Sequence, residues 1–252
     1  CSIYFLLVNI ISGVMGFSVT KELNGNKKER RELPEIELKE YTNKYICLIA
    51  FIICLGILLF GSKIITKFWM LIVFYVVILS LMIGVFYKQL IHDFKIFKSY
   101  FKEYFVLILK TWGKALVLIM ITTIIIQIIT HTTQANNQIA LQNLFNSNPV
   151  FVAILAMFYA PIAEELMFRG VFRKFIKNKK LFVIVSGVVF GLMHVIDDSK
   201  TLAEFSYVFV YSILGIYLAG IYAKTNNLCT NIFMHFMQNT LSVIGMILLM
   251  FM

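Results

Sequence analysis

The run VFVAILAMFYAPIAEELMFRG (residues 150–170) decides the fold, because it is long and apolar and yet carries charges near its end. Its apolar part is typical of a helix that crosses a membrane, which needs about 17 to 25 such residues. Glu164, Glu165 and Arg169 follow directly, although a charge near the bilayer centre costs roughly 2.5 to 3.5 kcal/mol. These residues therefore indicate a polar site buried among membrane helices.

The composition extends this interpretation to the whole chain. Of 252 residues, 60% are hydrophobic and only 14% are charged, which is more apolar side chain than a soluble core of this size can bury. We predict an all-α, polytopic transmembrane bundle of about eight helices, forming one integral membrane domain over residues 1–252. The richness in Ile, Lys and Asn favours a multi-pass protein of a bacterial cell membrane.

Eight apolar stretches approach or reach the length of a membrane span. Hydropathy would place His194 and His235 at different depths in their helices. We therefore expect the basic run 169–180 to be partly helical, or the last helix to begin before Asn231. The predicted spans are 2–18, 45–62, 68–87, 115–130, 150–168, 181–196, 205–223 and 231–252.

The positive charges indicate topology. Of the 23 Lys and Arg residues, 20 lie in the loops after the first, third, fifth and seventh predicted spans. The positive-inside rule places these loops in the cytoplasm and both ends of the chain outside. No basic cluster alternates with stacking aromatic residues on a soluble surface, so nucleic acid is excluded as a partner and the lipid bilayer is expected instead.

Three other features complete the organisation. Residues 88–102 alternate Phe with Lys and are expected to form a helix in the headgroup layer or an extension of the next span. Residues 131–149 are expected to be a plain loop, with a lid as the alternative.

Cys1, Cys47, Cys54 and Cys229 form no CxxC pair and are expected to act as small hydrophobic residues. Because Cys1 stands where Met is usual, we expect a truncated start, with lipid modification less favoured.

Helical geometry separates the two glutamates of the opening stretch. Glu165 and Arg169 lie one turn apart on one face and can form an ion pair. Glu164 lies about 100° around the helix and must find a partner on another helix or stay protonated. Pro161 removes a backbone donor, which frees a carbonyl and can open a polar pocket.

Two later segments carry matching polar residues. Phe190 and His194 share a helix face, and a GxxxG spacing on the same segment allows another helix to approach closely. His235 and Asn239 also lie four residues apart. Three helices could thus bring together a carboxylate, two imidazoles and a carboxamide, which is a set suited to activating water and stabilising an oxyanion. The alternative is structural, with the ion pair and the amide serving only helix packing.

These stretches resemble a known family. EELMFR (164–169), FGLMH (190–194) and HFMQN (235–239) are similar to the ordered motifs EExxxR, FxxxH and HxxxN of the CPBP or Abi family. That family contains CAAX prenyl endopeptidases and bacteriocin-processing or bacteriocin-immunity proteins. The resemblance covers about residues 150–252, which would form the catalytic core.

The resemblance implies an all-helical intramembrane endopeptidase with its active site in the last four helices. Glu164 would be the general base that activates water, and His194 would help to hold that water. His235 and Asn239 would stabilise the oxyanion. The remaining motif residues would support the site: Glu165, Arg169 and Phe190.

Metal dependence is a separate expectation. Members of the family are often labelled metalloproteases, and zinc, if bound, would be held by Glu164, His194 and His235. There is no HExxH stretch in the chain, and the glutamate mechanism needs only the same side chains. We therefore favour no metal and no other cofactor.

The implied substrate is a peptide or a membrane-anchored protein. CAAX-type processing, peptide-pheromone maturation and bacteriocin self-immunity all fit this chemistry. The alternative is a non-catalytic membrane scaffold or regulator of the same fold. A small transporter is a third possibility, although the chain lacks the repeat symmetry typical of that class.

Overall fold

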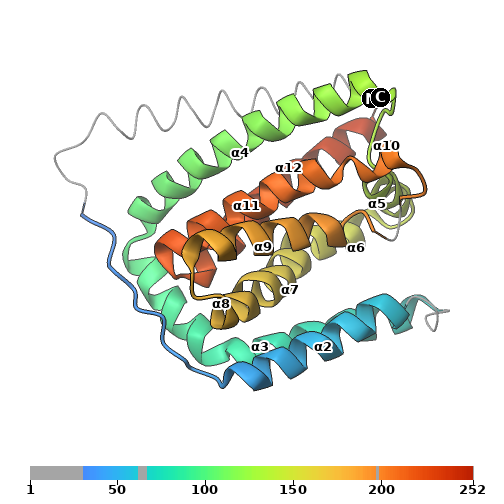
Figure 1. Cartoon of the computed structure of the whole chain (residues 1–252). Helices are drawn as coiled ribbons and strands as arrows, with labels where there is room; N and C mark the ends of the chain where they lie inside the picture. Colours follow the sequence, from blue (N-terminus) through green and yellow to red (C-terminus); the bar gives the residue numbers. More distant parts are fainter. Residues whose placement is uncertain (1–30, 62–66, 197–198, 252) are drawn as a thin grey trace.

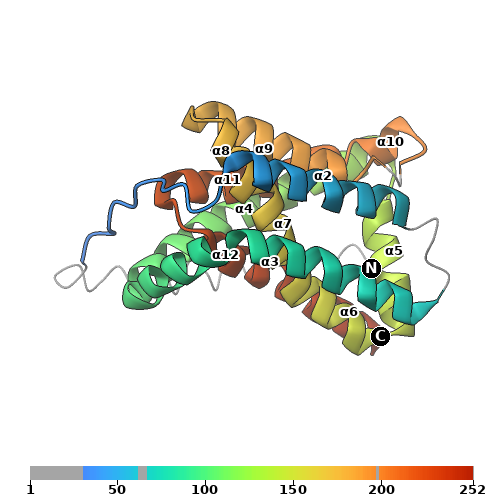
Figure 2. The same ribbon diagram turned by 90° about the horizontal axis from the view of Figure 1, so that it is seen from below.

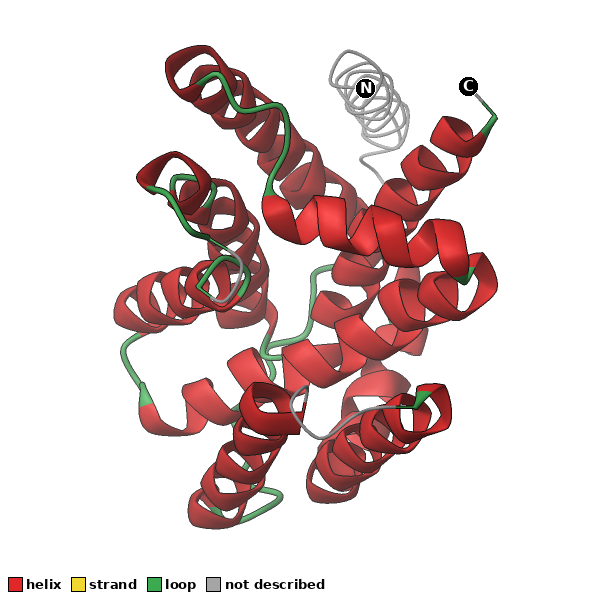
Figure 3. Ribbon diagram, turned by 90° about the vertical axis from the view of Figure 1, so that its right-hand side faces the viewer, coloured by secondary structure: helices red, strands yellow, loops and turns green. Residues whose placement is uncertain are grey.

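The computed structural model describes residues 31–61, 67–196 and 199–251. Every regular element in these ranges is a helix and none is a strand (Figure 3), which confirms the predicted all-α bundle. Within the same ranges, six helices are long and apolar enough to cross a membrane: Lys44–Gly61, Phe68–Ser99, Phe101–Thr130, Pro149–Phe175, Leu202–Thr225 and Leu228–Met250. The predicted first span, 2–18, lies outside the described residues.

Helices α2 (Lys44–Gly61) and α3 (Phe68–Ser99) run side by side along one edge of the bundle (Figures 1 and 2). The predicted span 68–87 is too short, because α3 continues without a break to Ser99 and buries Gln89, Asp93 and Phe97 on one face. Most of residues 88–102 therefore extend the preceding span, and the expectation of a separate helix or of an extension of the next span is wrong for them. Helix α4 (Phe101–Thr130) follows after one residue.

The predicted plain loop at 131–149 is also wrong in part, because it contains helix α5 (Asn136–Ser147). The apolar residues of this polar stretch explain the helix. Phe145 is buried in a cluster with Val152, Val243 and Met246. The segment therefore packs against the bundle through an apolar residue, although most of its residues are polar.

One continuous helical run, from Pro149 to Phe175, lies between α9 and the α2–α3 pair (Figure 1). It consists of α6 (Pro149–Ile154), η2 (Leu155–Tyr159), α7 (Ala160–Glu164), η3 (Glu165–Val171) and α8 (Phe172–Phe175), where η2 and η3 are π-helical. The run is longer than predicted, and α12 (Leu228–Met250) begins before Asn231. Both expected changes to the predicted boundaries are therefore found.

Helix α9 (Lys179–Met193) has only 15 residues and is not among the six candidate spans. The sixth predicted span, 181–196, is therefore a shorter helix than expected. Asn178 caps its start by accepting a hydrogen bond from the Leu181 N–H at 3.1 Å. Helix α10 (Leu202–Phe205) and helix α11 (Val208–Thr225) follow.

The predicted close approach at the GxxxG stretch is confirmed, because α9 packs directly on α11. A Cβ atom added at Gly187 would lie 2.7 Å from the backbone nitrogen of Ile216. One added at Gly191 would lie 2.7 Å from the backbone nitrogen of Ser212. Any side chain at either glycine would force these helices apart.

The start of α12 is fixed from α3. The Asp93 carboxylate accepts a hydrogen bond from the Leu228 N–H at 2.9 Å, and the Asn227 side-chain amide donates to the Asp93 carbonyl at 2.8 Å. Asn227 also caps the helix by accepting from the Thr230 N–H at 3.2 Å. These contacts satisfy backbone N–H groups at the start of α12. They also fix the position of α12 along α3, and with it the position of the side chains that α12 carries.

Candidate active site

Glu164 meets both motif histidines. It ends α7, His194 directly follows α9, and His235 lies within α12. The Glu164 Oε2 atom lies 3.9 Å from the Nε2 atom of His194 and 3.9 Å from the Nε2 atom of His235. From the sequence, Glu164 was expected to find a partner on another helix or to stay protonated, and two other segments place imidazoles 3.9 Å from its carboxylate.

The second glutamate belongs to a buried network behind this pair. Glu165 Oε1 lies 2.8 Å from His235 Nδ1 and 3.2 Å from Arg169 Nη1. Arg169 also donates to the Gly215 carbonyl at 2.8 Å, and the side chains of Glu165 and Arg169 are fully buried. The predicted ion pair is confirmed, and it connects the π-helical segment to α11 and α12.

The hydrogen-bond partners of the His194 and His235 imidazoles show which nitrogen of each ring carries the proton. The Nδ1 atom of His194 lies 2.8 Å from the Phe190 carbonyl, which can only accept a hydrogen bond. The Nδ1 atom of His235 faces the Glu165 carboxylate, which also accepts. Nδ1 therefore carries the proton in each neutral ring. Both Nε2 atoms then present lone pairs toward Glu164, so three acceptors meet where only a proton donor or a cation can satisfy them.

Two aromatic rings pack against His194. Its ring centroid lies 4.4 Å from that of Phe190 and 4.9 Å from that of Tyr211, the latter nearly parallel at 23°. Phe190 also contacts His235 edge-on at 5.8 Å and carries the Arg169 guanidinium 4.7 Å above its ring. Phe190 therefore packs against three residues of the site.

The π-helical turn η2 explains the position of Asn239. In this wide turn the Ala160 N–H bonds to the carbonyl of Leu155, five residues earlier. The same register would pair the Ala156 carbonyl with residue 161, which is a proline and has no N–H. The Asn239 side chain donates to that carbonyl at 2.7 Å. The carbonyl that Pro161 was predicted to free is thus present, and it binds the third motif.

Glu164, His194, His235 and Asn239 all line one cavity of about 550 Å³. Its wall also includes residues of α3, α4, α5 and α11 and is mostly apolar. The Glu164 Oε2 atom is buried and has no hydrogen-bond partner among the described residues. An acceptor of this kind, buried beside an internal space, is suited to hold a water molecule.

The structure therefore brings the predicted residues into one site, with some differences in their contacts. Asn239 lines the cavity but already uses one amide hydrogen on the Ala156 carbonyl. Asn231 was not singled out from the sequence, although it lies one turn before His235 and donates to Glu165 at 3.4 Å. Tyr211 was also missed, and no motif or spacing in the sequence marks it.

Glu164, His194 and His235 are the side chains that would hold a zinc ion if one were bound. Zinc needs ligand atoms at about 2.0 to 2.2 Å in a tetrahedral arrangement. Among the described residues, no group of three or more His, Cys, Asp and Glu side chains has the arrangement that holds a metal ion. The side chains thus do not form a preassembled metal site.

Part of the chain is similar to a known protein family and to two curated bacterial proteins. Residues 146–241 match the Rce1-like type II CAAX prenyl endopeptidases. "Putative membrane peptidase YdiL" of Bacillus subtilis (strain 168) is 28% identical over 114 residues, which cover 44% of this chain and 43% of that protein. "UPF0177 protein YvdC" of Lactococcus lactis subsp. lactis (strain IL1403) is 28% identical over 127 residues, covering 50% of this chain and 46% of that protein.

The matches span less than half the length of these two relatives, and no solved structure is significantly similar to the chain. The segment that matches the family contains the three motifs and each of the side chains that meet at Glu164. Residues 146–241 of this integral membrane protein are therefore similar to the Rce1-like type II CAAX prenyl endopeptidase family, also called CPBP or Abi.

Proposed function

We propose that this chain is an intramembrane endopeptidase that hydrolyses a peptide bond with water activated by Glu164. The observation that carries the proposal is the Glu164 Oε2 atom, which is buried without a hydrogen-bond partner among the described residues and lies 3.9 Å from the Nε2 atom of each histidine. A water molecule about 2.8 Å from these atoms can donate one hydrogen to the carboxylate and the other to an imidazole.

In the first step, Glu164 takes a proton from this water. The water oxygen then attacks the carbonyl carbon of the substrate, and the carbonyl oxygen becomes an oxyanion. His194 is held by its Nδ1 hydrogen bond and by two aromatic rings, so its Nε2 atom stays aimed at the water. Fixed orientation of this kind contributes to the rate because little reorganisation is needed.

In the second step, the oxyanion is stabilised and the bond to nitrogen breaks. His235 can donate from Nε2 when it is protonated, and the Glu165 carboxylate at 2.8 Å supports the positive charge. Asn239 has a second amide hydrogen beside the one that it gives to the Ala156 carbonyl. Glu164 returns its proton to the leaving nitrogen, so that a new carboxyl group and a new amine are formed.

The cavity suggests the kind of substrate. A mostly apolar wall and a volume of about 550 Å³ suit a short stretch of peptide with apolar side chains, which is carried by a membrane-associated peptide or protein. CAAX-type processing, peptide-pheromone maturation and bacteriocin self-immunity remain the candidate biological roles.

The test compares peptide termini in membranes and medium of cells that express the native chain or the variant Glu164→Gln at matched levels. The proposal expects at least one defined terminus to disappear in the variant while a longer precursor accumulates, which also identifies the substrate. Glu32→Gln, an exposed carboxylate outside the cavity, is the matched control and should leave the termini unchanged. Unchanged termini in Glu164→Gln, together with a phenotype on deletion, would favour the non-catalytic scaffold.

A further inference from the structure

Two buried cations lie in α8, at the end of the helical run that carries Glu164, and take no part in the proposed reaction. Arg173 is 5% exposed and Lys174 is 8% exposed. Within the described ranges, neither side chain forms an ion pair with a carboxylate. Burying an unpaired charge is costly, so this pair calls for a compensating anion.

The hydrogen-bond partners of Arg173 and Lys174 are uncharged carbonyl oxygens, and they do not use all of the donors of the two side chains. The Nη1 atom of Arg173 donates to the carbonyls of Ile176 and Lys177 at 2.7 Å each, whereas its buried Nε atom has no partner among the described residues. The Nζ atom of Lys174 reaches only the Thr42 carbonyl, at 3.4 Å. Arg173 also lies over Phe182 and Lys174 over Phe86, at 5.6 Å and 5.5 Å from the ring centroids. These contacts leave hydrogen-bond donors of both cations available.

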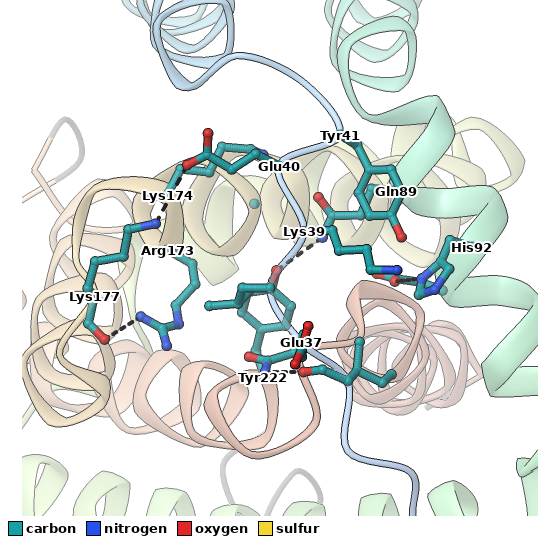
Figure 4. Close-up of a pocket in the computed structure, with 15 residues that line it drawn as sticks. Glu37, Lys39, Glu40, Tyr41, Gln89, His92, Arg173, Lys174, Lys177 and Tyr222 are labelled. Atoms are coloured by element: carbon teal, nitrogen blue, oxygen red, sulfur yellow. Dashed lines mark hydrogen bonds and ion pairs between the residues drawn. The ribbon is translucent and has the colours of Figure 1, made fainter.

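Both side chains line a small pocket (Figure 4). It lies between the segment 36–41, the end of α3, α8 and the end of α11, and Lys39 and Lys177 also line it (Figure 4). Its volume is about 30 Å³, whereas a single water molecule needs roughly 10 to 15 Å³ on the same scale. The space suits one group of a few heavy atoms, such as a phosphate, and excludes a whole lipid headgroup.

The charge around this pocket favours an anion. Four Lys and Arg side chains line it, against three carboxylates. Two of the carboxylates are engaged, since Glu40 pairs with Lys177 at 3.7 Å and Asp93 accepts from the Leu228 N–H at 2.9 Å. The third, Glu37, is exposed. The pocket also adjoins the loops that the positive-inside rule places in the cytoplasm, where anionic lipid headgroups and soluble phosphates are both present.

We infer that the pocket between segment 36–41 and α8 binds a phosphate group, with Arg173 and Lys174 as its buried cationic partners. The planar guanidinium of Arg173 suits phosphate oxygens and keeps donors beyond the two hydrogen bonds of Nη1, and Lys174 adds a point charge. A phosphate bound here would tie the segment 36–41 to the end of the helix that carries Glu164. The phosphate belongs to an anionic phospholipid or to a soluble compound, and the experiment separates these sources.

The test measures the thermal unfolding midpoint of the purified full chain in detergent. One arm adds phosphatidylglycerol, with diacylglycerol as the phosphate-free lipid comparison, and the other adds inorganic phosphate, with sodium chloride at equal ionic strength. Binding to the folded state should raise the midpoint by about 4 °C or more at saturating probe. A rise with phosphatidylglycerol alone identifies a lipid, and a rise with inorganic phosphate identifies the soluble group. No rise above the comparisons in either arm overturns the proposal.

Variants locate the effect in this pocket. Lys174→Gln should remove most of the rise, while Lys224→Gln, an exposed lysine outside the pocket, should keep it. An equal rise in both variants would mean adventitious surface binding and would contradict the site. Arg173→Gln also removes hydrogen bonds at the end of α8 and can weaken folding. Glu40→Gln therefore serves as a second test, because it frees Lys177 and should lower the probe concentration needed for half of the effect.

Discussion

Helices α2 and α3 are more apolar than the membrane-spanning helices of the C-terminal half and are held in a different way. The mean hydropathy of the most apolar stretch is 2.5 in α2 and 2.7 in α3, against 1.6 to 1.8 in the C-terminal spans. Within the most apolar stretch of each helix, 11% of the residues are buried in the α3 span and 50% in the Leu202–Thr225 span. Lipid tails are as apolar as these side chains, so burial alone gives little drive for helices to associate in a bilayer. The C-terminal half instead depends on close backbone contact and on buried polar groups.

This difference separates two kinds of position in one membrane protein. Outward-facing residues of α2 and α3 need only be apolar, whereas buried residues of the C-terminal helices need a particular size or hydrogen-bonding group. The predictions below test this contrast, beginning with the largest expected effect.

Arg169→Leu should destabilise the fold most, by about 3 to 5 kcal/mol, because it leaves the buried Glu165 carboxylate without its cation. The measurement is the free energy of unfolding in a denaturing-detergent titration. The double variant Glu165→Leu with Arg169→Leu should recover part of the loss, since neither charge is then buried alone. Equal losses in the single and double variants would show that the ion pair is not the cause.

Gly191→Ala should cost about 1 to 3 kcal/mol, because the new methyl group meets the backbone of α11 at 2.7 Å. Gly220→Ala is the matched control, since a Cβ atom there meets nothing within 4 Å. Alanine favours a helix over glycine, so the control should be neutral or slightly stabilising. A similar result for both glycines would contradict the role of close contact between α9 and α11.

Tyr211→Leu should lower kcat about tenfold with little change in KM, because it removes one of the two rings that hold the His194 imidazole. Tyr211→Phe keeps the ring and should retain most of the activity. The assay uses the substrate identified from the accumulated precursor. If Phe and Leu at this position lower kcat equally, the ring contact does not position His194.

Val77→Ala should change the unfolding free energy by less than about 0.5 kcal/mol, because Val77 is 46% exposed on α3 and gains little from burial. Its neighbour Ile78 is 0% exposed, and Ile78→Ala should cost about 2 to 5 kcal/mol. The pair of variants on one helix therefore shows whether burial, and not hydropathy alone, decides the cost of a substitution in this part of the protein. Similar losses at both positions would contradict the idea that outward-facing residues of α3 need only be apolar.

Chelation should leave the cleavage rate unchanged, because the proposed mechanism uses only protein side chains and water. The rate is measured before and after dialysis against a strong chelator. Loss of activity that zinc alone restores would replace this mechanism with one in which a metal activates the water.

The sequence predicted more of the site than of the helix ends. Apolar runs and charge placement indicated the membrane bundle, and i, i+4 spacing indicated the Glu165–Arg169 pair, since both follow from local geometry. The end of α3 could not be predicted from hydropathy, because its last residues are polar and are held by tertiary contacts such as that of Asp93 with α12. Helix α5 was missed for a similar reason, since Phe145 gains its burial from distant segments.

Within the site, the missed features are those that depend on more than one helix. Tyr211 acquires its role only because α11 brings it against His194. The π-helical turns change which carbonyl is free, so the contact of Asn239 with Ala156 could not be read from spacing alone. Pro161 gave the one local indication that a carbonyl would be available there.

The most direct test of the central claim is the cleavage rate of purified native chain and of Glu164→Gln in liposomes, with the thermal unfolding midpoint measured for both. A general base of this kind contributes about 100- to 10,000-fold to the rate. The account predicts a loss of that size in Glu164→Gln with an unchanged midpoint. A variant that folds normally and cleaves within a few-fold of the native rate would contradict it.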